Sequence, residues 1–449
     1  MKKLLYGTII LAGVAVFATA AVAQEYTLSD LYQQALKNSE KMKMAQENLY
    51  IAQYGKDKAW AVLMPRVTAY GTYNRFSEEK YNVSQMTLPL PAPLEPVTIE
   101  SSVLVQPSES GTWGVRADQS FSLSARELTA LKVTGQTITK SVYDLDATKS
   151  DFVLIVASAY YDVMKAKKAL EITAANMERL TSYRNSVEKR VTVGELTKTA
   201  LLRSEGELSG ARADYLKATN AFQLARFALV RITGIEDEFR LKETALPEQD
   251  DVAFTQLRSI AFDKRADLKS YDMQVQIAEG YVTFARGAFW PNVNLAAIYN
   301  RVDQNPAAET LNRESLMGMV SLQFPFFEGG LRVAEYREAR AKERQAKLAY
   351  DDFKKNVDIE LQGAYLDLQT QKGALQFSED QLTFAQENYG AVARQFDNGL
   401  ATNLDVMDAN SLLLSAERSV ADAYYSYQLA YLRVKRSNGT LLKFVISSN

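Results

Sequence analysis

The side chains available for chemistry in this sequence are carboxylates, amines, guanidiniums and hydroxyls, because its 449 residues include no cysteine and no histidine. These absences exclude a Ser–His–Asp triad, an imidazole base, and a zinc site with thiolate or imidazole ligands. Pairs of carboxylates can still hydrolyse glycosidic bonds, but the 54 acidic residues are spread along polar segments. The sequence also lacks a Gly-x-x-x-x-Gly-Lys-Ser/Thr phosphate loop. We therefore predict that the protein is not an enzyme and needs no cofactor and no metal.

The charge balance gives no support to nucleic-acid binding. The 52 basic and 54 acidic residues give a formal net charge of −2. A nucleic-acid-binding surface needs a clear excess of Lys and Arg. We therefore expect no nucleic-acid partner.

Two Gly–Thr turns hold the most distinctive polar residues. Gly194 is followed by Thr197, and Gly399 by Thr402, in the pattern of a left-handed helix end followed by the N-cap of a returning helix. Thr402 and Asp405 also form the sequence pattern of a capping box, in which each side chain bonds the backbone N–H of the other residue. This pattern gives Asp405 a structural role, with which a functional role is compatible.

Long proline-free segments lead into both turns. Ser124 to Val193 contains no proline and has Gly135 as its only interior glycine, and Leu331 to Asp397 again lacks proline. About 66 helical residues extend roughly 100 Å. Their apolar residues are small and scattered, with charges on more than one side, so these helices suit a thin wall of laterally packed helices rather than a thick core. We predict two long helical hairpins over about 125–232 and 331–436.

This arrangement occurs twice because the sequence is internally duplicated. Gln223-Leu224-Ala225 recurs as Gln428-Leu429-Ala430, 205 positions later, whereas Tyr73-Asn74-Arg75 recurs as Tyr299-Asn300-Arg301, 226 positions later. The first copy therefore carries an insertion of 21 residues between Arg75 and Trp113. The segment between these residues holds half of the 10 prolines, with polyproline-like spacing. We expect a surface loop or lid over Pro89 to Pro107, and the role of 77–111 as a whole stays open.

The predicted organisation is a signal peptide, a first repeat, a linker, a second repeat and a C-terminal tail, over residues 1–23, 24–234, 235–251, 252–439 and 440–449. Each repeat opens with a helical segment, over Leu28–Val62 and Val252–Ala288, and continues with two strands before its helical hairpin. The strands are predicted at about 65–76, 112–123, 291–301 and 316–326.

The N-terminus has the residue order of a secretory signal peptide. Lys2 and Lys3 precede an apolar stretch from Leu4 to about Ala20, and Ala21-Val22-Ala23 provides a small-residue cleavage site. A retained membrane anchor is the alternative. The sequence has no other run of 18 or more apolar residues, so any membrane that the mature chain spans must be crossed by β-strands.

The four predicted strands alternate between apolar and polar residues, which is the signature of a membrane β-barrel. The apolar parity comprises Val67, Ala69, Gly71, Tyr73, Trp113, Val115, Ala117, Phe121, Leu123, Val293, Leu295, Ala297, Tyr299, Leu316, Val320, Leu322, Phe324 and Phe326. Trp60, Trp113 and Trp290 flank or begin these strands, as an aromatic belt at a membrane interface requires. The alternative is that the tryptophans anchor the core of a soluble sheet.

Four strands in one chain leave two unpaired edges, which lipid cannot satisfy. A barrel must therefore be shared between copies. A dimer gives a tight 8-stranded barrel with little lumen, whereas a trimer gives 12 strands and, from the paired helices, a 12-helix cylinder. These considerations permit a trimer or a tetramer. The predicted fold class is an α+β membrane protein: a duplicated unit with four strands per chain in a shared β-barrel, plus long α-helical barrel hairpins.

Three further motifs have a specific order and spacing. The strand starts are Pro65-Arg66-Val67 and Pro291-Asn292-Val293, and Phe324-Pro325-Phe326-Phe327-Glu328-Gly329-Gly330 precedes the second long helix. The segment Asn398-Gly399-Leu400-Ala401-Thr402-Asn403-Leu404-Asp405-Val406-Met407-Asp408-Ala409 matches a G-x-x-T-x-x-D-V-x-D-A tip. With the duplication, these motifs make the chain resemble the TolC-like outer-membrane efflux factor family over essentially its whole mature length.

This resemblance implies a homotrimer with a 12-stranded β-barrel in outer-membrane lipid, a periplasmic α-helical tunnel and a mixed equatorial belt. It implies the exit duct of a tripartite efflux pump or a type I secretion system in a Gram-negative-type bacterium. The expected partners are a periplasmic adaptor (membrane fusion) protein and an inner-membrane pump of the RND or ABC type.

By the same resemblance, Asp405 and Asp408 ring the closed periplasmic aperture. Three copies of each carboxylate near a threefold axis would attract cations. The family often has a basic residue at the position of Ala401, where it ties neighbouring helices together. The alanine leaves the contacts of the gate open.

The helix tips are the expected docking region for the adaptor. Val193-Gly194-Glu195 and Gly399-Leu400 match the family's tips, and the alternative is that they are helix turns only. Arg190 and Arg394 lie one turn before the tips, and we expect both side chains to be solvated.

The competing function is a soluble periplasmic coiled-coil adaptor or structural rod. It requires sustained apolar heptads, which Leu331 to Asp397 does not show. The cargo of a duct, whether drug, metal ion or polypeptide, is not encoded in its own sequence, because selectivity usually resides in the pump. The absence of Met/His/Cys clusters gives no support to a soft-metal specialist.

Overall fold

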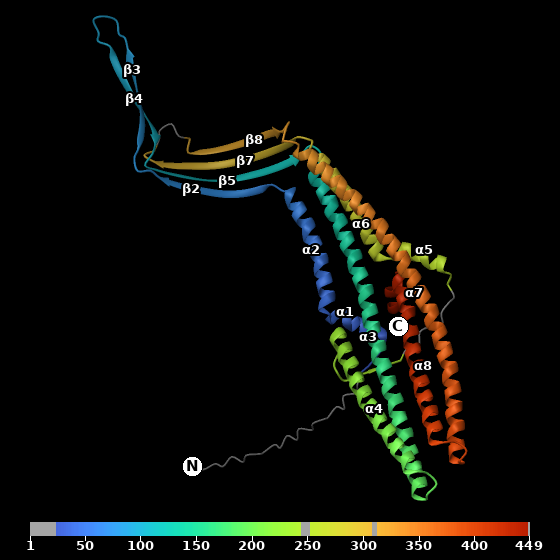
Figure 1. Cartoon of the computed structure of the whole chain (residues 1–449). Helices are drawn as coiled ribbons and strands as arrows, with labels where there is room; N and C mark the ends of the chain where they lie inside the picture. The colour runs from blue at the N-terminus through green and yellow to red at the C-terminus, as the bar shows by residue number, and fades with distance from the viewer. Residues whose placement is uncertain (1–23, 244–251, 308–311, 448–449) are drawn as a thin grey trace, which may run out of the picture.

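A four-stranded sheet lies toward one end of the elongated molecule, and long helices run from it to the opposite end (Figure 1). The computed structural model describes residues 24–243, 252–307 and 312–447. The predicted signal peptide, 1–23, and residues 244–251 of the predicted linker lie outside the described residues.

The helices are α1 (Leu28–Asn38), α2 (Glu40–Val62), α3 (Arg126–Thr192), α4 (Lys198–Thr233), α5 (Phe254–Lys264), α6 (Ala266–Gly287), α7 (Leu331–Asp397), α8 (Asn403–Ser437) and α9 (Leu441–Ser447). The strands are β1 (Gln24–Tyr26), β2 (Arg66–Arg75), β3 (Lys80–Leu88), β4 (Val97–Gln106), β5 (Glu109–Ser122), β6 (Phe239–Leu241), β7 (Asn292–Asn305) and β8 (Glu314–Gln323). Within the described residues, no helix combines the length and apolar character needed to span a membrane.

The boundaries of these elements repeat at the two offsets found in the sequence. Helices α3 and α7 are both 67 residues long, and they begin at Arg126 and Leu331, 205 positions apart. Helices α1 and α5 are both 11 residues long, and they begin at Leu28 and Phe254, 226 positions apart. The two halves therefore fold as copies of one arrangement.

The long helices α3 and α7 extend from the sheet to the far end, whereas the other helices cover only part of that length (Figure 1). Helices α2 and α6 pack on the sheet-side half, and α4 and α8 pack on the far half. The main hydrophobic core lies between these halves, where α1, α9 and the parallel pair β1–β6 meet α3 and α8. Its largest fully buried side chains include Tyr160, Leu229, Leu361, Leu368 and Leu432.

The helical segments that open each repeat are broken in the structure, although the sequence predicts them as continuous. The breaks fall at Ser39 and Arg265, where the backbone is extended. The first segment begins with a capping box formed by Thr27 and Asp30. Both breaks lie at the central core, where the chain changes direction to cover the end of the neighbouring half-length helix.

The two breaks are held by different side chains. Asn38 Nδ2 donates to the carbonyl oxygens of Thr233 at 3.3 Å and Gly234 at 3.2 Å, which closes the end of α4. At the equivalent place in the second repeat, Arg265 Nη1 donates to the carbonyl of Ser437 at 3.1 Å. The Arg265 side chain is only 2% exposed, and Nη2 contacts Asp267 at 2.6 Å. The first junction is neutral and the second is ionic.

The sheet has the order β2-β5-β7-β8, with every neighbouring pair antiparallel. Val67 pairs with Ala117, Ala117 with Ala297, and Ala297 with Gly318, so the predicted apolar parity lies on one face of all four strands. Phe324 and Phe326, predicted on the last strand, follow its end at Gln323. Among the described residues, β2 and β8 each have one edge without a partner strand.

The insertion in the first repeat is a β-hairpin, β3–β4, which extends the β2–β5 pair beyond the sheet (Figure 1). The expectation of a surface loop or lid over Pro89 to Pro107 is therefore wrong for 97–106, which form β4, whereas 89–96 form an exposed connecting loop. Pro89, Pro91, Pro93 and Pro96 all lie in the connection between the two strands, and Pro107 lies between β4 and β5. Proline is tolerated there because no ladder hydrogen bond is required of it.

The segment after the second hairpin, 440–449, was expected to be a tail, but most of it forms α9. Leu441 is 0% and Val445 3% exposed, and both belong to the central core. The predicted linker likewise contains β6, which pairs in parallel with β1. Packing against the core gives both short segments a partner that local sequence patterns do not reveal.

Candidate aperture and docking tips at the far end of the helices

The first helical tip is built by Gly194 in the left-handed conformation, with φ of +83°. The Gly194 N–H donates to the Val191 carbonyl at 3.0 Å, and the Glu195 N–H donates to the Arg190 carbonyl at 2.9 Å. These two bonds are those of a Schellman motif, which satisfies the last carbonyls of α3. Val193 is 71% exposed at the end of this helix.

The second tip has the same geometry. Gly399 has φ of +74°, its N–H donates to the Phe396 carbonyl at 2.9 Å, and the Leu400 N–H donates to the Gln395 carbonyl at 2.8 Å. Leu400 is 81% exposed. The structure thus places Val193, Glu195 and Leu400 on two similar exposed turns at the end farthest from the sheet (Figure 1).

The returning helices start at the two threonines. Thr197 Oγ1 accepts a hydrogen bond from the Ala200 N–H at 3.4 Å. Thr402 and Asp405 form a full capping box, in which Asp405 Oδ2 accepts from the Thr402 N–H at 2.8 Å and from its hydroxyl at 2.7 Å. Hydrogen bonds from the Thr402 hydroxyl and N–H lower the pKa of the exposed Asp405 carboxyl. Asp405 is therefore held ionised by its own helix cap.

Both candidate aperture residues face away from the packed side of α8. Asp405 and Asp408 are exposed one turn apart, whereas Val406 and Met407 are 3% and 7% exposed. Met407 packs in a small cluster that includes Leu180 of α3. The packing of α8 against its own chain therefore leaves both carboxylates free to face an axis or a neighbouring chain.

Arg190 is not solvated as expected but ties the two tips together. Its Nε donates to Glu195 at 2.9 Å, its Nη1 donates to the Phe396 carbonyl at 2.8 Å, and its guanidinium lies 4.8 Å from the centre of the Phe396 ring. Arg394 is exposed, in agreement with the expectation. Ala401 packs against the apolar cluster that contains Phe396 and Val406.

Polar contacts between α3 and α8 form a second set of functional candidates that sequence reasoning missed. Arg179 makes a bidentate ion pair with Glu417 at 3.0 Å, and Tyr183 donates a hydrogen bond to Asn403. A buried bond of 2.9 Å joins Asn410 Nδ2 to Asn176. No sequence signal indicates these pairs, because their members are more than 200 positions apart.

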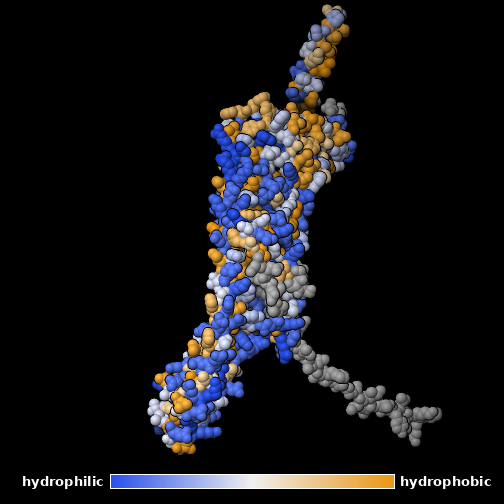
Figure 2. Space-filling view, turned by 90° about the vertical axis from the view of Figure 1, so that its right-hand side faces the viewer, coloured by the Kyte–Doolittle hydropathy of each residue, from blue (hydrophilic) through white to orange (hydrophobic). Residues whose placement is uncertain are grey.

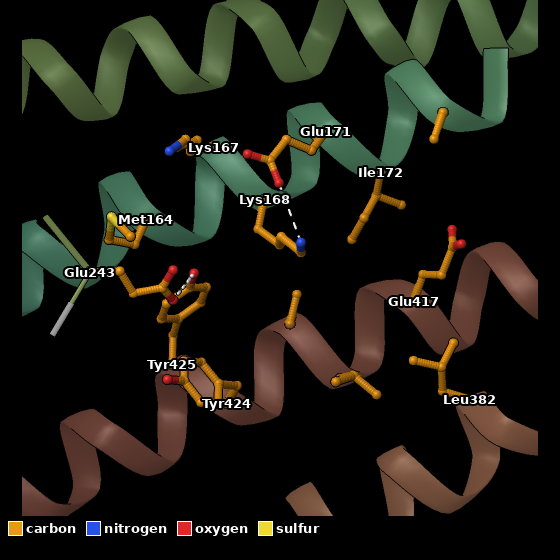
Figure 3. A pocket seen from close by; sticks show the side chains of 13 residues that line it. Met164, Lys167, Lys168, Glu171, Ile172, Glu243, Leu382, Glu417, Tyr424 and Tyr425 are labelled. Atoms are coloured by element: carbon orange, nitrogen blue, oxygen red, sulfur yellow. Dashed lines mark hydrogen bonds and ion pairs between the residues drawn. The ribbon is translucent and has the colours of Figure 1, made fainter. Parts of the chain in front are cut away.

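A cavity of about 510 Å³ opens between α3, α7 and α8 (Figure 3). Its carboxylates are already bonded: Glu171 to Lys168 at 3.3 Å, Glu243 to the Tyr425 hydroxyl at 3.1 Å, and Glu417 to Arg179. Burial raises the pKa of Tyr425, so its hydroxyl stays a hydrogen-bond donor. The cavity thus presents no free carboxylate pair for acid–base chemistry. Across the described residues, no group of three or more Asp or Glu side chains is placed to hold a metal ion.

The tryptophans lie at two levels of the sheet. Trp60 is in the last turn of α2 and Trp290 precedes β7, so both lie where the sheet meets the helices. Trp113 is inside β5, nine residues before its end at Ser122, which is about 30 Å along a strand. All three are 46–58% exposed, and the ring of Trp113 contacts Tyr299 edge-on at 5.9 Å. Figure 2 shows apolar side chains gathered at this sheet end of the molecule.

The sequence profile of the outer membrane efflux protein family matches residues 31–235 and 257–440. These two ranges cover most of the chain and correspond to its two copies. The protein belongs to the outer membrane efflux protein family. It is therefore an outer-membrane efflux protein, and its long helices extend from the membrane into the periplasm.

Individual relatives agree with this assignment. Outer membrane protein TolC of Vibrio cholerae is 24% identical over 313 residues, which are 66% of this chain and 69% of the relative. Outer membrane efflux protein BepC of Brucella suis is 19% identical over 443 residues, 98% of this chain and 91% of the relative. The crystal structure of VceC from Vibrio cholerae superimposes with a TM-score of 0.75 at 17% identity, over 92% of this chain and 96% of VceC. This likeness shows that the fold is that of outer-membrane efflux channels.

Proposed function

We propose that three copies of this protein form the passive exit duct of a tripartite efflux pump or a type I secretion system. The observation that carries this proposal is a sheet whose two outer strands have no further partner among the described residues, and which has one apolar face and is joined to helices of about 100 Å. A sheet of this kind closes in lipid only by pairing β2 of one copy with β8 of the next. Three copies supply 12 strands around a lumen wide enough to conduct.

The exposed apolar residues of α7 support assembly through the sides of the helices. Leu348, Leu366 and Phe384 are 56–70% exposed and lie 18 residues apart, which is five turns of an α-helix. Helix α4 carries a similar exposed stripe that includes Leu216 and Phe227. Such stripes on the two outermost helices of a chain are suited to packing against a neighbouring copy.

We infer that the far end of the duct is its periplasmic entrance. Three copies of Asp405 and Asp408 would form a negative ring at the axis, and the exposed carboxylates of the structure are free to do so. The turns with Val193, Glu195 and Leu400 would be the docking points of a periplasmic adaptor. The duct needs no catalytic step or cofactor of its own, and an inner-membrane pump of the RND or ABC type would supply the energy.

The relatives do not define one cargo. Their names include an alkaline protease secretion protein of Pseudomonas aeruginosa and a cation efflux system protein of Escherichia coli. Such different cargoes are consistent with a duct that several kinds of pump can use.

The proposal is tested by purifying the protein from membranes with detergent, measuring its mass, and recording conductance in planar bilayers. We expect a trimer that forms stable pores. The double variant Leu366→Asp/Phe384→Asp should dissociate the trimer, whereas Glu379→Lys, on another side of α7, should not. A protein that is monomeric and soluble without detergent, and that conducts no current, would instead support the alternative of a periplasmic rod.

A further inference from the structure

The sheet has a second face, opposite the apolar parity, which includes Gly114 and Ala296. On it, Gly114 is buried and Ala296 is 8% exposed, whereas their strand neighbours Val115 and Leu295 on the apolar face are 41% and 38% exposed. In the barrel of the proposed function, the apolar face meets lipid and the opposite face lines the lumen. The side chains of this inner face are therefore the ones that cargo passes.

Most positions on the inner face are polar, as expected for a lumen, but one contiguous group is not. Ile298, Met317 and Met319 occupy neighbouring inner positions of β7 and β8, where Ala296 pairs with Met319 and Ile298 with Met317. Met317 is 50% and Met319 42% exposed. A contiguous group of large exposed apolar side chains on an otherwise polar surface indicates a site of contact with a ligand or partner.

The first repeat has an apolar contact at the equivalent level. The two offsets of the duplication relate Ala296 to Tyr70 and Met319 to Gly114, and Tyr70 pairs directly with Gly114. The Tyr70 ring covers this glycine so closely that a Cβ there would lie 2.8 Å from the Tyr70 Oη. Each repeat thus pairs one large residue with one small residue. The large residue is on the first strand of the pair in the first repeat (Tyr70 on β2) and on the second strand in the second repeat (Met319 on β8).

We propose that Tyr70, Ile298, Met317 and Met319 form an apolar contact belt inside the barrel that binds amphipathic organic molecules during their passage. The inference rests on the proposed function, because it requires a closed barrel. In a trimer, the duplication places three Tyr70–Gly114 pairs and three Met319–Ala296 pairs at the same height along the barrel axis. Twelve strands about 4.8 Å apart, tilted by about 40°, enclose a radius of about 12 Å, so cargo of drug size passes within reach of the belt.

The class of ligand follows from the side chains around the belt. Methionine is flexible and polarizable, so it adapts to apolar groups of different shape. Next to Ile298 in the sheet register lies Arg116, which bonds Asp118 at 2.8 Å on the same face. A molecule with an apolar body and a charged group therefore finds partners for both parts. Thioethers also bind soft cations such as Ag⁺, and this is the competing ligand that the experiment must separate.

The test records current through the wild-type trimer in planar bilayers while sodium decanoate is added, with sodium acetate as the anion without an apolar chain. We expect decanoate to block the current and acetate to have little effect. In Met317→Gln/Met319→Gln, which keeps the side-chain volume, the half-blocking concentration of decanoate should rise about fivefold or more. Met86→Gln makes the same chemical change in the hairpin beyond the sheet, where Met86 is 64% exposed, and should leave the block unchanged.

The proposed belt would be refuted if decanoate blocked the wild type and the double variant equally. It would also be refuted if acetate blocked the current as strongly as decanoate. Block by silver nitrate that is lost in the double variant, without any effect of decanoate, would replace it with a soft-cation site. Should the double variant not assemble, Tyr70→Ser provides the same readout from the other repeat. A wild-type protein that forms no pore refutes the proposed function itself, whereas a normal pore without selective block refutes the belt alone.

Discussion

Asp405 has two roles that a single carboxylate can perform together. It accepts hydrogen bonds from the N–H and the hydroxyl of Thr402, the N-cap residue of α8. Its side chain nevertheless remains exposed at the tip of the molecule. Asp408 has no part in the capping box and lies one turn further along the same exposed side. The structural role of Asp405 therefore does not compete with its proposed place at the aperture, and the two residues can be tested as a pair.

Asp405→Asn/Asp408→Asn should reduce the preference of the pore for cations, because the negative ring at the narrowest point would lose its charge. Asparagine at position 405 retains an oxygen that can accept the cap hydrogen bonds. The reversal potential in a KCl gradient measures the change. Glu207→Ala, which removes an exposed carboxylate from α4, serves as the matched control and should leave the potential unchanged. An unaltered potential in the double variant would show that these carboxylates do not line the constriction.

The pH at which cation preference is lost should depend on Thr402. Its hydrogen bonds lower the pKa of Asp405, so in the wild type this charge persists to lower pH than for an ordinary aspartate and is lost as the pH falls through the lowered pKa. Thr402→Val removes the hydroxyl donor and should move the loss of cation preference to higher pH. The measurement is the reversal potential as a function of pH. A variant that titrates like the wild type would exclude a contribution of this cap to the charge of Asp405.

At the scale of elements, the two junctions in the central core differ in chemistry although they occupy equivalent places in the repeat. The first is sealed by the amide of Asn38, and the second by the buried guanidinium of Arg265. Around Arg265, Asp267 and Glu360 accept its remaining hydrogen bonds, and Arg436 joins Glu360 to Asp151 of α3. This ionic network connects α3, α6, α7 and α8 at one level, which anchors the upper end of the α7–α8 hairpin.

Arg265→Met should destabilise the folded protein by about 3 kcal/mol, because it leaves Asp267 without its buried partner. The loss is smaller than for a fully buried network, since Glu360 is 42% exposed. Arg258→Met removes a pair whose side chains are 50% and 34% exposed and should cost less than about 1 kcal/mol. Urea unfolding of the detergent-solubilised protein compares the two. Equal losses of stability in both variants would show that the burial of Arg265 has no energetic consequence.

Local patterns in the sequence were sufficient for the turns of the candidate site. Gly194, Gly399, Thr197 and Thr402 have the predicted conformations because caps depend on bonds between residues three to five positions apart. The expected solvation of Arg190 is wrong for the opposite reason. Its partner, the Phe396 carbonyl, is 206 positions away, and only the packing of two hairpins brings it within reach.

At the scale of the whole molecule, the β3–β4 hairpin is an addition to one repeat of an otherwise duplicated design. The sequence of the second repeat lacks the 21-residue insertion of the first. The four sheet strands pair without any contribution from the hairpin. A two-stranded hairpin on its own is only marginally stable, so its stability depends on continuity with β2 and β5. The hairpin is therefore dispensable for closing the proposed barrel.

Replacing residues 77–107 by a short Gly-Asn turn should leave trimer formation and pore conductance largely intact. The physical reason is that the β2–β5 ladder from Arg75–Glu109 to Arg66–Asp118 is unchanged by the replacement. Detergent-resistant trimers and single-channel conductance are the two readouts. Loss of the trimer on removal of this segment would mean that the hairpin contributes to contacts between copies.

The sequence by itself determined the duplication, the parity of the strands, the turns at the helix tips and the family of the protein. These features depend on neighbours a few residues apart or on repetition along the chain, and both are present in the order of the residues. Tertiary structure decided the break at Arg265, the docking of α9, the link of Arg190 to Phe396, and the pairing of Met317 with Ile298 across two strands. These features depend on which distant segments become neighbours, and packing between the two repeats determines that choice.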